Sequence, residues 1–217
     1  MFGQAIPGKE VALRFDKLIP GIESYSAANT MYRLLDVDKN FYDMKLIKKP
    51  NDEEFHANEP IFANLLPDDR LLLEHMIANL KSTKEFLLSL SEDKLMYRYA
   101  KEKWTIKEVL IHLIDMERVY TYRALRFARN DQTGLPGFDD KHYVYHSGAI
   151  NRDILSLLKE LEAVRYSTIA MVEGFDENAL TRSGTINGKP VSVRALIYHI
   201  AGHELHHIKI IKERYLT

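Results

Sequence analysis

The amino-acid sequence predicts an all-α fold: a four-helix bundle with a long crossover loop between its second and third helices, plus an irregular N-terminal extension. Apolar residues recur at helical spacing in four segments of about 20 residues each, and no strand pattern runs through the centre of the chain. Hydrophobic residues make up 46% of the 217 residues, which is enough for a substantial core. Before residue 67, by contrast, prolines interrupt every short apolar group.

The first two helices are predicted from apolar spacing and from a start signal. The residues that recur at helical spacing in the first are Leu72, Met76, Leu80, Leu87 and Leu90. They predict a helix over about 68–90. Before the second helix, Thr105 is followed three residues later by Glu108, which is the pattern of a capping box. This second helix is expected to run to about Arg129.

The next segment combines a crossover with a third helix. Residues 130–146 contain two glycines and a proline, so they are predicted to form a long crossover loop. An apolar stripe over residues 150–171 predicts the third helix, and Gly174 is expected to end it.

A tight turn and a fourth helix are predicted near the C-terminus. Asn187 and Gly188 form the dipeptide typical of a tight turn in a small hairpin. Ser192 can then cap a last helix that runs to about Arg214. The four segments together are expected to pack as an antiparallel bundle.

Composition limits both the domain organisation and the function. Residues 1–66 are predicted to be an extension packed on the bundle, and residues 67–217 to be the bundle domain. The 30 basic and 31 acidic residues give a net charge of -1, which does not favour nucleic acid or an anionic membrane as a partner. The absence of cysteine excludes disulfides, thiolate nucleophiles and Cys-ligated zinc. No apolar run at the start suits a signal peptide or a membrane span, so a cytoplasmic protein is expected.

Histidines are the unusual feature of the composition, with nine in the chain. In the predicted last helix, His203 and His207 fall within about 20° of Leu196, at the centre of the apolar face. His199 and His206 fall about 60–80° away, at the edge of that face. We therefore expect His203 and His207 to be largely buried and His206 to be clearly more exposed.

These positions suit a metal site. Two histidines at i and i+4 lie about 6 Å apart on one helix face and can chelate one ion. His112 lies at the core margin of the second helix and could supply a third nitrogen, while Asp115, one turn on, could orient an imidazole. Chance alone gives about 0.4 histidine pairs at this spacing. The ordinary alternative to a metal ligand is therefore a core histidine that bonds to a backbone carbonyl. Two histidines on one apolar face are harder to explain in this way, because each buried ring needs a hydrogen-bond partner.

The same segment also matches the zincin peptidase pattern H-E-x-x-H. In that reading His203 and His207 bind zinc and Glu204 is the general base. Zincins usually place a third ligand well downstream, whereas ten residues follow His207. No strands that could hold a peptide substrate are predicted, so the peptidase is the less favoured interpretation.

Longer stretches resemble a known family. They are KWTIKEVLIHLIDMERVYTYRALRFARND, LPGFDD, NRDILSLLKELEAVR and SVRALIYHIAGHELHHIKIIKERY. From about Leu72 to Tyr215 the sequence is similar to the DinB/YfiT-like superfamily, in particular its DinB_2 branch. The resemblance implies a four-helix bundle with a metal site of three histidines, here His112, His203 and His207. It also implies nickel, zinc or iron as the divalent metal ion, and a homodimer. Characterised relatives are metal-dependent hydrolase-like proteins and transferases of low-molecular-weight thiols such as bacillithiol or mycothiol.

The function expected from these observations is a metal-dependent hydrolase or thiol transferase that acts on a small-molecule substrate. Its metal would keep an open position at which water or a thiol is activated. Glu204, Asp115 and Arg118 are the candidate catalytic residues for handling protons, and their alternative interpretation is charge on a helix surface. The alternative function is a non-catalytic, stress-related module that binds a metal or a ligand. An open coordination position beside a pocket would favour the enzyme, and a closed core would favour the binder.

Overall fold

The computed structural model describes residues 44–55 and 60–216. The chain divides into two compact units, Met1–Met44 and Lys45–Thr217, and the described residues after Met44 all belong to the second. The prediction that residues 1–66 pack on the bundle thus falls largely outside the described part of the chain. None of the helices in the described ranges is long and apolar enough to cross a membrane.

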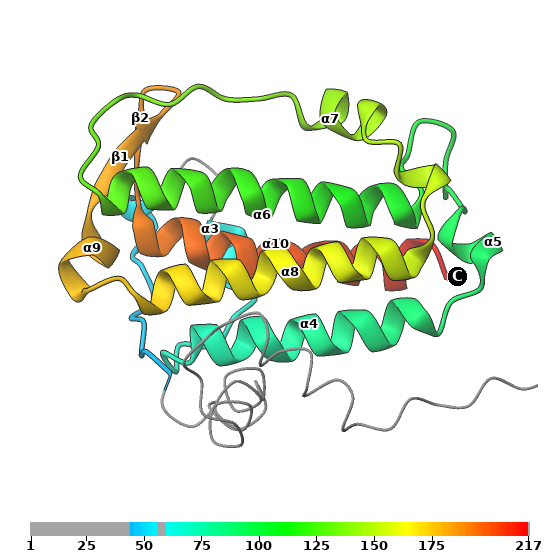
Figure 1. The fold of residues 1–217 in the computed structure, drawn as a ribbon, viewed down its shortest axis with the longest axis horizontal. Helices are drawn as coiled ribbons and strands as arrows, with labels where there is room; N and C mark the ends of the chain where they lie inside the picture. Colours follow the sequence, from blue (N-terminus) through cyan, green and yellow to red (C-terminus); the bar gives the residue numbers. More distant parts are fainter. Residues whose placement is uncertain (1–43, 56–59, 217) are drawn as a thin grey trace, which may run out of the picture. The chain divides into compact units, whose positions relative to one another are not determined.

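Four long helices form the second unit, as predicted: α4 (Leu72–Leu88), α6 (Ile106–Ala128), α8 (Ile154–Glu173) and α10 (Val193–Arg214). They run side by side as a bundle (Figure 1). Helices α6 and α4 each pack against both α8 and α10. The bundle therefore makes neighbours of α6 and α10, the two helices that carry the candidate metal ligands.

The helix starts follow from side chains that bond to the backbone. Thr105 accepts a hydrogen bond from the backbone N–H of Glu108 at 3.1 Å, and the Glu108 carboxylate accepts one from the N–H of Thr105 at 2.7 Å. This confirms the predicted capping box of α6. Ser192 caps α10 by accepting from the N–H of Ala195 at 3.1 Å. Helix α8 begins four residues later than the first residue of its predicted stripe, because Asp153 is its cap.

The crossover between α6 and α8 differs from the prediction. A loop was expected over residues 130–146, but α7 (Asp140–His146) occupies its second half, capped by the side chain of Asp139. A short 3-10 helix, Ala149–Asn151, follows it. The prediction was wrong here because glycine and proline lie only in the first half of the segment. Figure 1 shows the crossover running along α6, with α7 beside it.

The predicted turn is present as a hairpin. Strands β1 (Ser183–Ile186) and β2 (Lys189–Ser192) pair antiparallel around a turn in which Asn187 and Gly188 both have positive φ, 49° and 77°. Positive φ at both positions is what a two-residue hairpin turn requires. Leu135 of the crossover bonds to this hairpin through its N–H, at 2.8 Å from the carbonyl of Thr185.

Short elements complete the second unit. They are the 3-10 helix Asp52–Glu54 and the helices α3 (Pro60–Ala63), α5 (Glu92–Leu95) and α9 (Glu177–Thr181). Helix α3 packs on α10 at Gly202, where a Cβ atom would lie only 2.0 Å from the carbonyl oxygen of Phe62. The glycine therefore permits a close approach of two backbones, and this approach places α3 beside the histidines of α10.

Candidate metal centre

Three histidines from two neighbouring helices converge on one point. His112 comes from α6, and His203 and His207 come from α10. The Nε2 atom of His203 lies 3.2 Å from that of His112 and 3.0 Å from that of His207. Two ligands bound to zinc at tetrahedral angles, about 2.0–2.1 Å from it, are separated by about 3.3–3.4 Å. The three nitrogens of this histidine cluster thus have nearly the spacing that a shared ion imposes.

Burial keeps the histidine cluster neutral at physiological pH. Burial lowers the pKa of His112 to about 4, although Asp140 opposes the shift. It also lowers the pKa of His207 to about 3 and that of His203 well below its usual value, and the neighbouring histidines add to both shifts. Neutral imidazoles keep the lone pair that a metal needs. Within the described residues, this is the one group of three or more such side chains close enough to hold an ion.

The exposure of the α10 histidines agrees only in part with the prediction. His203 is buried, as expected, but His207 and His206 are both half-buried, so the clear contrast predicted between these two is not seen. His199, placed at the edge of the apolar face by its spacing, is 3% exposed.

Two aromatic side chains account for the burial of His199. The Phe62 ring of α3 packs edge-on against the rings of His199, His203 and His206, at centroid distances of 4.9, 5.4 and 5.2 Å. Tyr120 stacks on His199 at 4.1 Å. The periodicity of α10 alone could not reveal this, because α3 lies in a segment whose pattern predicts no helix.

The carboxylate that approaches the histidine cluster is not the expected one. Oδ2 of Asp140, on α7, lies 4.0 Å from Nδ1 of His112, on the side of the ring that faces away from the other histidines. Asp115, expected to orient an imidazole, has Arg118 3.7 Å away. Asp140 was missed because α7 was taken for a loop.

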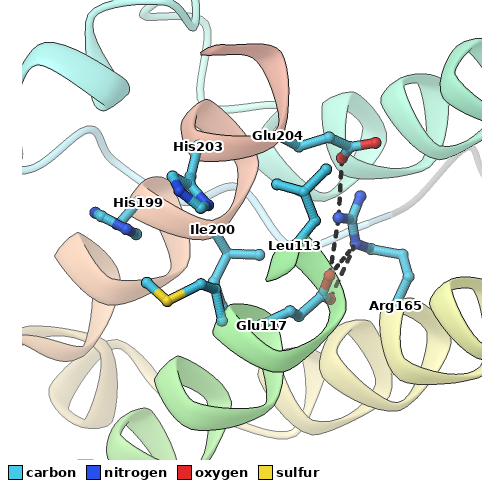
Figure 2. A pocket seen from close by; sticks show the side chains of 8 residues that line it. Leu113, Glu117, Arg165, His199, Ile200, His203 and Glu204 are labelled. Carbon is cyan, nitrogen blue, oxygen red and sulfur yellow. Dashed lines mark hydrogen bonds and ion pairs between the residues drawn. The ribbon is translucent and has the colours of Figure 1, made fainter. Parts of the chain in front are cut away.

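Glu204 belongs to a second buried cluster. Arg165 of α8 donates from Nε and Nη2 to the carboxylate of Glu117 at 2.9–3.1 Å, and its Nη2 lies 2.9 Å from Oε2 of Glu204. Thr83 donates its hydroxyl to Glu204 at 2.7 Å. Figure 2 shows Glu204 directed towards Arg165 and away from the ring of His203. The ion-pair cluster of Glu117, Arg165 and Glu204 had no signal in the helical spacing used to find the histidines.

The other two candidate catalytic residues lie on α6. Arg118 is ion-paired with Glu160 of α8 and remains 47% exposed. Asp115 is half-buried, and burial raises the pKa of its carboxyl group, while Arg118 opposes this shift. Arg118 thus has the character of a surface ion pair. Asp115 keeps a raised proton affinity one turn from His112.

A small cavity separates the two buried clusters. His199 and His203 line it on one side, and Glu117, Arg165 and Glu204 line it on the other (Figure 2). Its volume is about 10 Å³, comparable to the space for one water molecule. The cavity is therefore too small for an organic substrate, and any substrate must approach the histidine cluster from elsewhere.

Comparison with known proteins agrees with this fold. A protein of Oceanobacillus iheyensis, named as a candidate metal-dependent hydrolase, is 27% identical over 131 residues, which are 59% of this chain and 74% of that protein. The structure of YfiT from Bacillus subtilis, described as a candidate metal-dependent hydrolase with an unusual four-helix bundle topology, superposes with a TM-score of 0.59. That match has 18% identity and covers 76% of this chain and 90% of YfiT, so it shows a shared fold. The family model of the DinB superfamily matches residues 75–211, more than half of the sequence, and the chain therefore belongs to the DinB superfamily.

Proposed function

We propose that this protein is a metal-dependent hydrolase whose divalent ion is held by the Nε2 atoms of His112, His203 and His207. The observation that carries the proposal is the convergence of these three neutral nitrogens, with separations of 3.2 and 3.0 Å. Neutral imidazoles at such spacing cannot all satisfy one another, because each shared proton serves only one pair. The names of the similar proteins support hydrolysis as the reaction class.

The donor set fits the metals expected from the resemblance. Imidazole nitrogens suit zinc, nickel and iron, and three protein ligands leave a further position for water or substrate. A bound divalent ion would supply Lewis acidity, which lowers the pKa of a water or thiol beside it. Transfer of a low-molecular-weight thiol to a small molecule would use the same lowering of a pKa, here that of the thiol. This variant of the proposal relies on the family resemblance alone.

The residues around the histidine cluster are candidates for orienting an imidazole and for accepting a proton. Oδ2 of Asp140 lies 4.0 Å from Nδ1 of His112, too far for a hydrogen bond, but its negative charge favours a proton at Nδ1 and so leaves Nε2 free to bind. Asp115 is the candidate proton acceptor, because burial raises its pKa. Glu204 is already engaged by Arg165 and Thr83, so it is a poor general base, and the zincin interpretation loses its central residue. Arg118 is already paired with Glu160 of α8, so it is a weak candidate for handling protons.

The alternative, a non-catalytic metal-binding module, has one observation in its favour. The cavity beside His203 has a volume of only about 10 Å³, which gives no room for a substrate on the inner side of the histidine cluster. Against it, His207 is half-buried and Asp140 is 46% exposed, so the cluster can be approached from the α7 side.

The proposal is tested by elemental analysis and by activity. The purified protein is expected to contain about one divalent ion per chain, and hydrolysis of ester, amide and phosphoester panels is to be measured with and without that ion. Thiol transfer is measured in parallel with bacillithiol, mycothiol and glutathione. Bound metal with no turnover in any assay would favour the non-catalytic module, and a metal-free protein that takes up no added zinc or nickel would refute the site.

A further inference from the structure

The ion-pair cluster ties the four helices together at one point. Arg165 comes from α8, Glu117 from α6 and Glu204 from α10, while the hydroxyl that reaches Glu204 belongs to Thr83 of α4. A further bond runs from Nη1 of Arg165 to the carbonyl oxygen of Met76, also in α4, at 2.7 Å. The three charged side chains are only 1–2% exposed. Bulk water thus contributes little to screening the charges of this cluster.

The charges within the ion-pair cluster do not balance. Glu117 accepts a two-pronged contact from Arg165, and Glu204 shares the same guanidinium. Two carboxylates and one guanidinium leave one net negative charge in the interior. Burial acts to lower the pKa of Arg165, but the two carboxylates raise it far above its ordinary value, so the guanidinium stays charged. A buried net charge is unfavourable unless an opposite charge lies nearby.

The proposed metal site, when occupied, would carry an excess of positive charge. Three neutral imidazoles would hold a divalent cation without supplying any negative charge. Glu204 follows His203 directly in the chain, and a cavity of about 10 Å³ separates the two clusters. Opposite charges attract more strongly across a buried interior than across water, because the interior screens them less.

We propose, on the basis of the proposed metal site, that the ion-pair cluster is the buried counter-charge of the bound cation. Arg165 holds Glu117 and Glu204 where they attract the cation through space without becoming ligands. The coordination positions not taken by histidine then stay open. The ion-pair cluster thereby raises the affinity for the metal. Its uncompensated charge lowers the free energy of unfolding of the metal-free protein.

The test uses Glu204→Gln, which removes the net charge and little else. The new amide can accept from Arg165 through its oxygen and donate to the oxygen of Thr83 through its nitrogen. The Thr83 hydroxyl, which donates to Glu204 in the wild type, can then turn its proton to a backbone carbonyl of its own helix. Zinc affinity is measured by competition with a chromophoric chelator, and the free energy of unfolding of the metal-free protein is measured in urea. We expect zinc affinity to fall by about 10- to 100-fold, the range for outer-shell partners of a metal site, and metal-free stability to be unchanged or higher.

Two further variants complete the test. Glu162→Gln removes the same charge from a surface pair with Lys84, where screening is strong, and should change zinc affinity by less than about twofold. Glu117→Gln makes the same charge change on α6 and replaces Glu204→Gln if that variant fails to fold.

The outcomes separate this inference from the proposed function. If the wild-type protein binds zinc and Glu204→Gln leaves the affinity unchanged, the counter-charge role is wrong and the metal site stands. If that variant loses affinity and metal-free stability together, the cluster is only structural and the inference is overturned. If the wild-type protein binds no ion, the metal site and the counter-charge role both fail.

Discussion

The histidine cluster and the ion-pair cluster are both buried beside α10, yet only the second pairs groups of opposite charge. Arg165 finds acceptors for its Nε, Nη1 and Nη2 atoms at 2.7–3.1 Å. The nitrogens of the histidine cluster face one another at 3.0 and 3.2 Å without any charge between them. A buried cluster can thus stabilise the fold through the bonds that its members make, and can serve a ligand through what those bonds leave unmatched, which is lone pairs in the histidine cluster and one negative charge in the ion-pair cluster. The predictions below test this difference.

Removing the centre of the ion-pair cluster should have the largest effect. Arg165→Met leaves the carboxylates of Glu117 and Glu204 buried without a cation, so the free energy of unfolding should fall by about 3–5 kcal/mol. The matched control is Lys84→Met, which breaks the partly exposed pair with Glu162 and should cost about 0–1 kcal/mol. Urea unfolding of both variants measures the difference. Equal losses would mean that the buried ion pairs stabilise the fold no more than a surface pair does.

Removing the centre of the histidine cluster should affect metal binding instead. His203 lies next to both other ring nitrogens, so His203→Ala should lower zinc affinity by more than about 100-fold, beyond the range for residues outside the coordination sphere. His206→Ala, on the same helix and half-buried, should retain about one ion per chain. Elemental analysis of the two folded variants checks this. Loss of metal from the His206 variant with retention in the His203 variant would contradict the assignment.

Displacing α3 should disturb the histidine side of α10 more than the ion-pair side. Gly202→Ala puts a methyl group 2.0 Å from the carbonyl oxygen of Phe62, so α3 must shift, at a cost of about 1–3 kcal/mol. Gly174→Ala, whose Cβ would meet its nearest neighbour at 3.4 Å, is the control and should change stability little. Calorimetric melting of both variants gives the comparison. A melting temperature of Gly202→Ala equal to that of the wild type would show that α3 does not hold this position.

The pH dependence of the metal-free protein should come from its buried histidines, which are the histidine cluster and His199, whose pKa burial lowers to about 3. Histidines in the unfolded chain bind protons near pH 6.5, but burial delays protonation to about pH 4 for His112 and about pH 3 for His207. The unfolded state therefore binds more protons in this window. The free energy of unfolding should fall on acidification from about pH 6.5 to 4, by up to about 1.4 kcal/mol per pH unit and histidine.

Variants at two histidines separate this effect from general acid denaturation. His112→Gln should make the pH slope of the metal-free protein shallower, because one buried group no longer titrates. His142→Gln, at an exposed position of α7, should leave the slope as it is. Urea unfolding at half-unit pH steps gives the slopes. Identical slopes in all three proteins would exclude the histidine cluster as their source.

The amino-acid sequence is sufficient to predict the four helices and the side of α10 that carries two of the converging histidines. The starts of α6 and α10 depend on hydrogen bonds between residues three positions apart, Thr105 with Glu108 and Ser192 with Ala195. The inward direction of His203 follows from the 3.6-residue period, which also places His207 on that face but predicts it to be more buried than it is. Such interactions join residues that are close together in the chain. They can therefore be predicted from the sequence without knowledge of the rest of the fold.

The groups that surround those histidines depend on how the helices pack against one another. Helix α3 buries His199, and α7 places Asp140 near His112. Arg165 forms an ion pair with Glu204, which makes this carboxylate a poor general base. These contacts join residues that are tens of positions apart and lie on different elements. Helical periodicity gives the direction of a side chain on its own helix, but which group of another element meets it depends on how the helices pack.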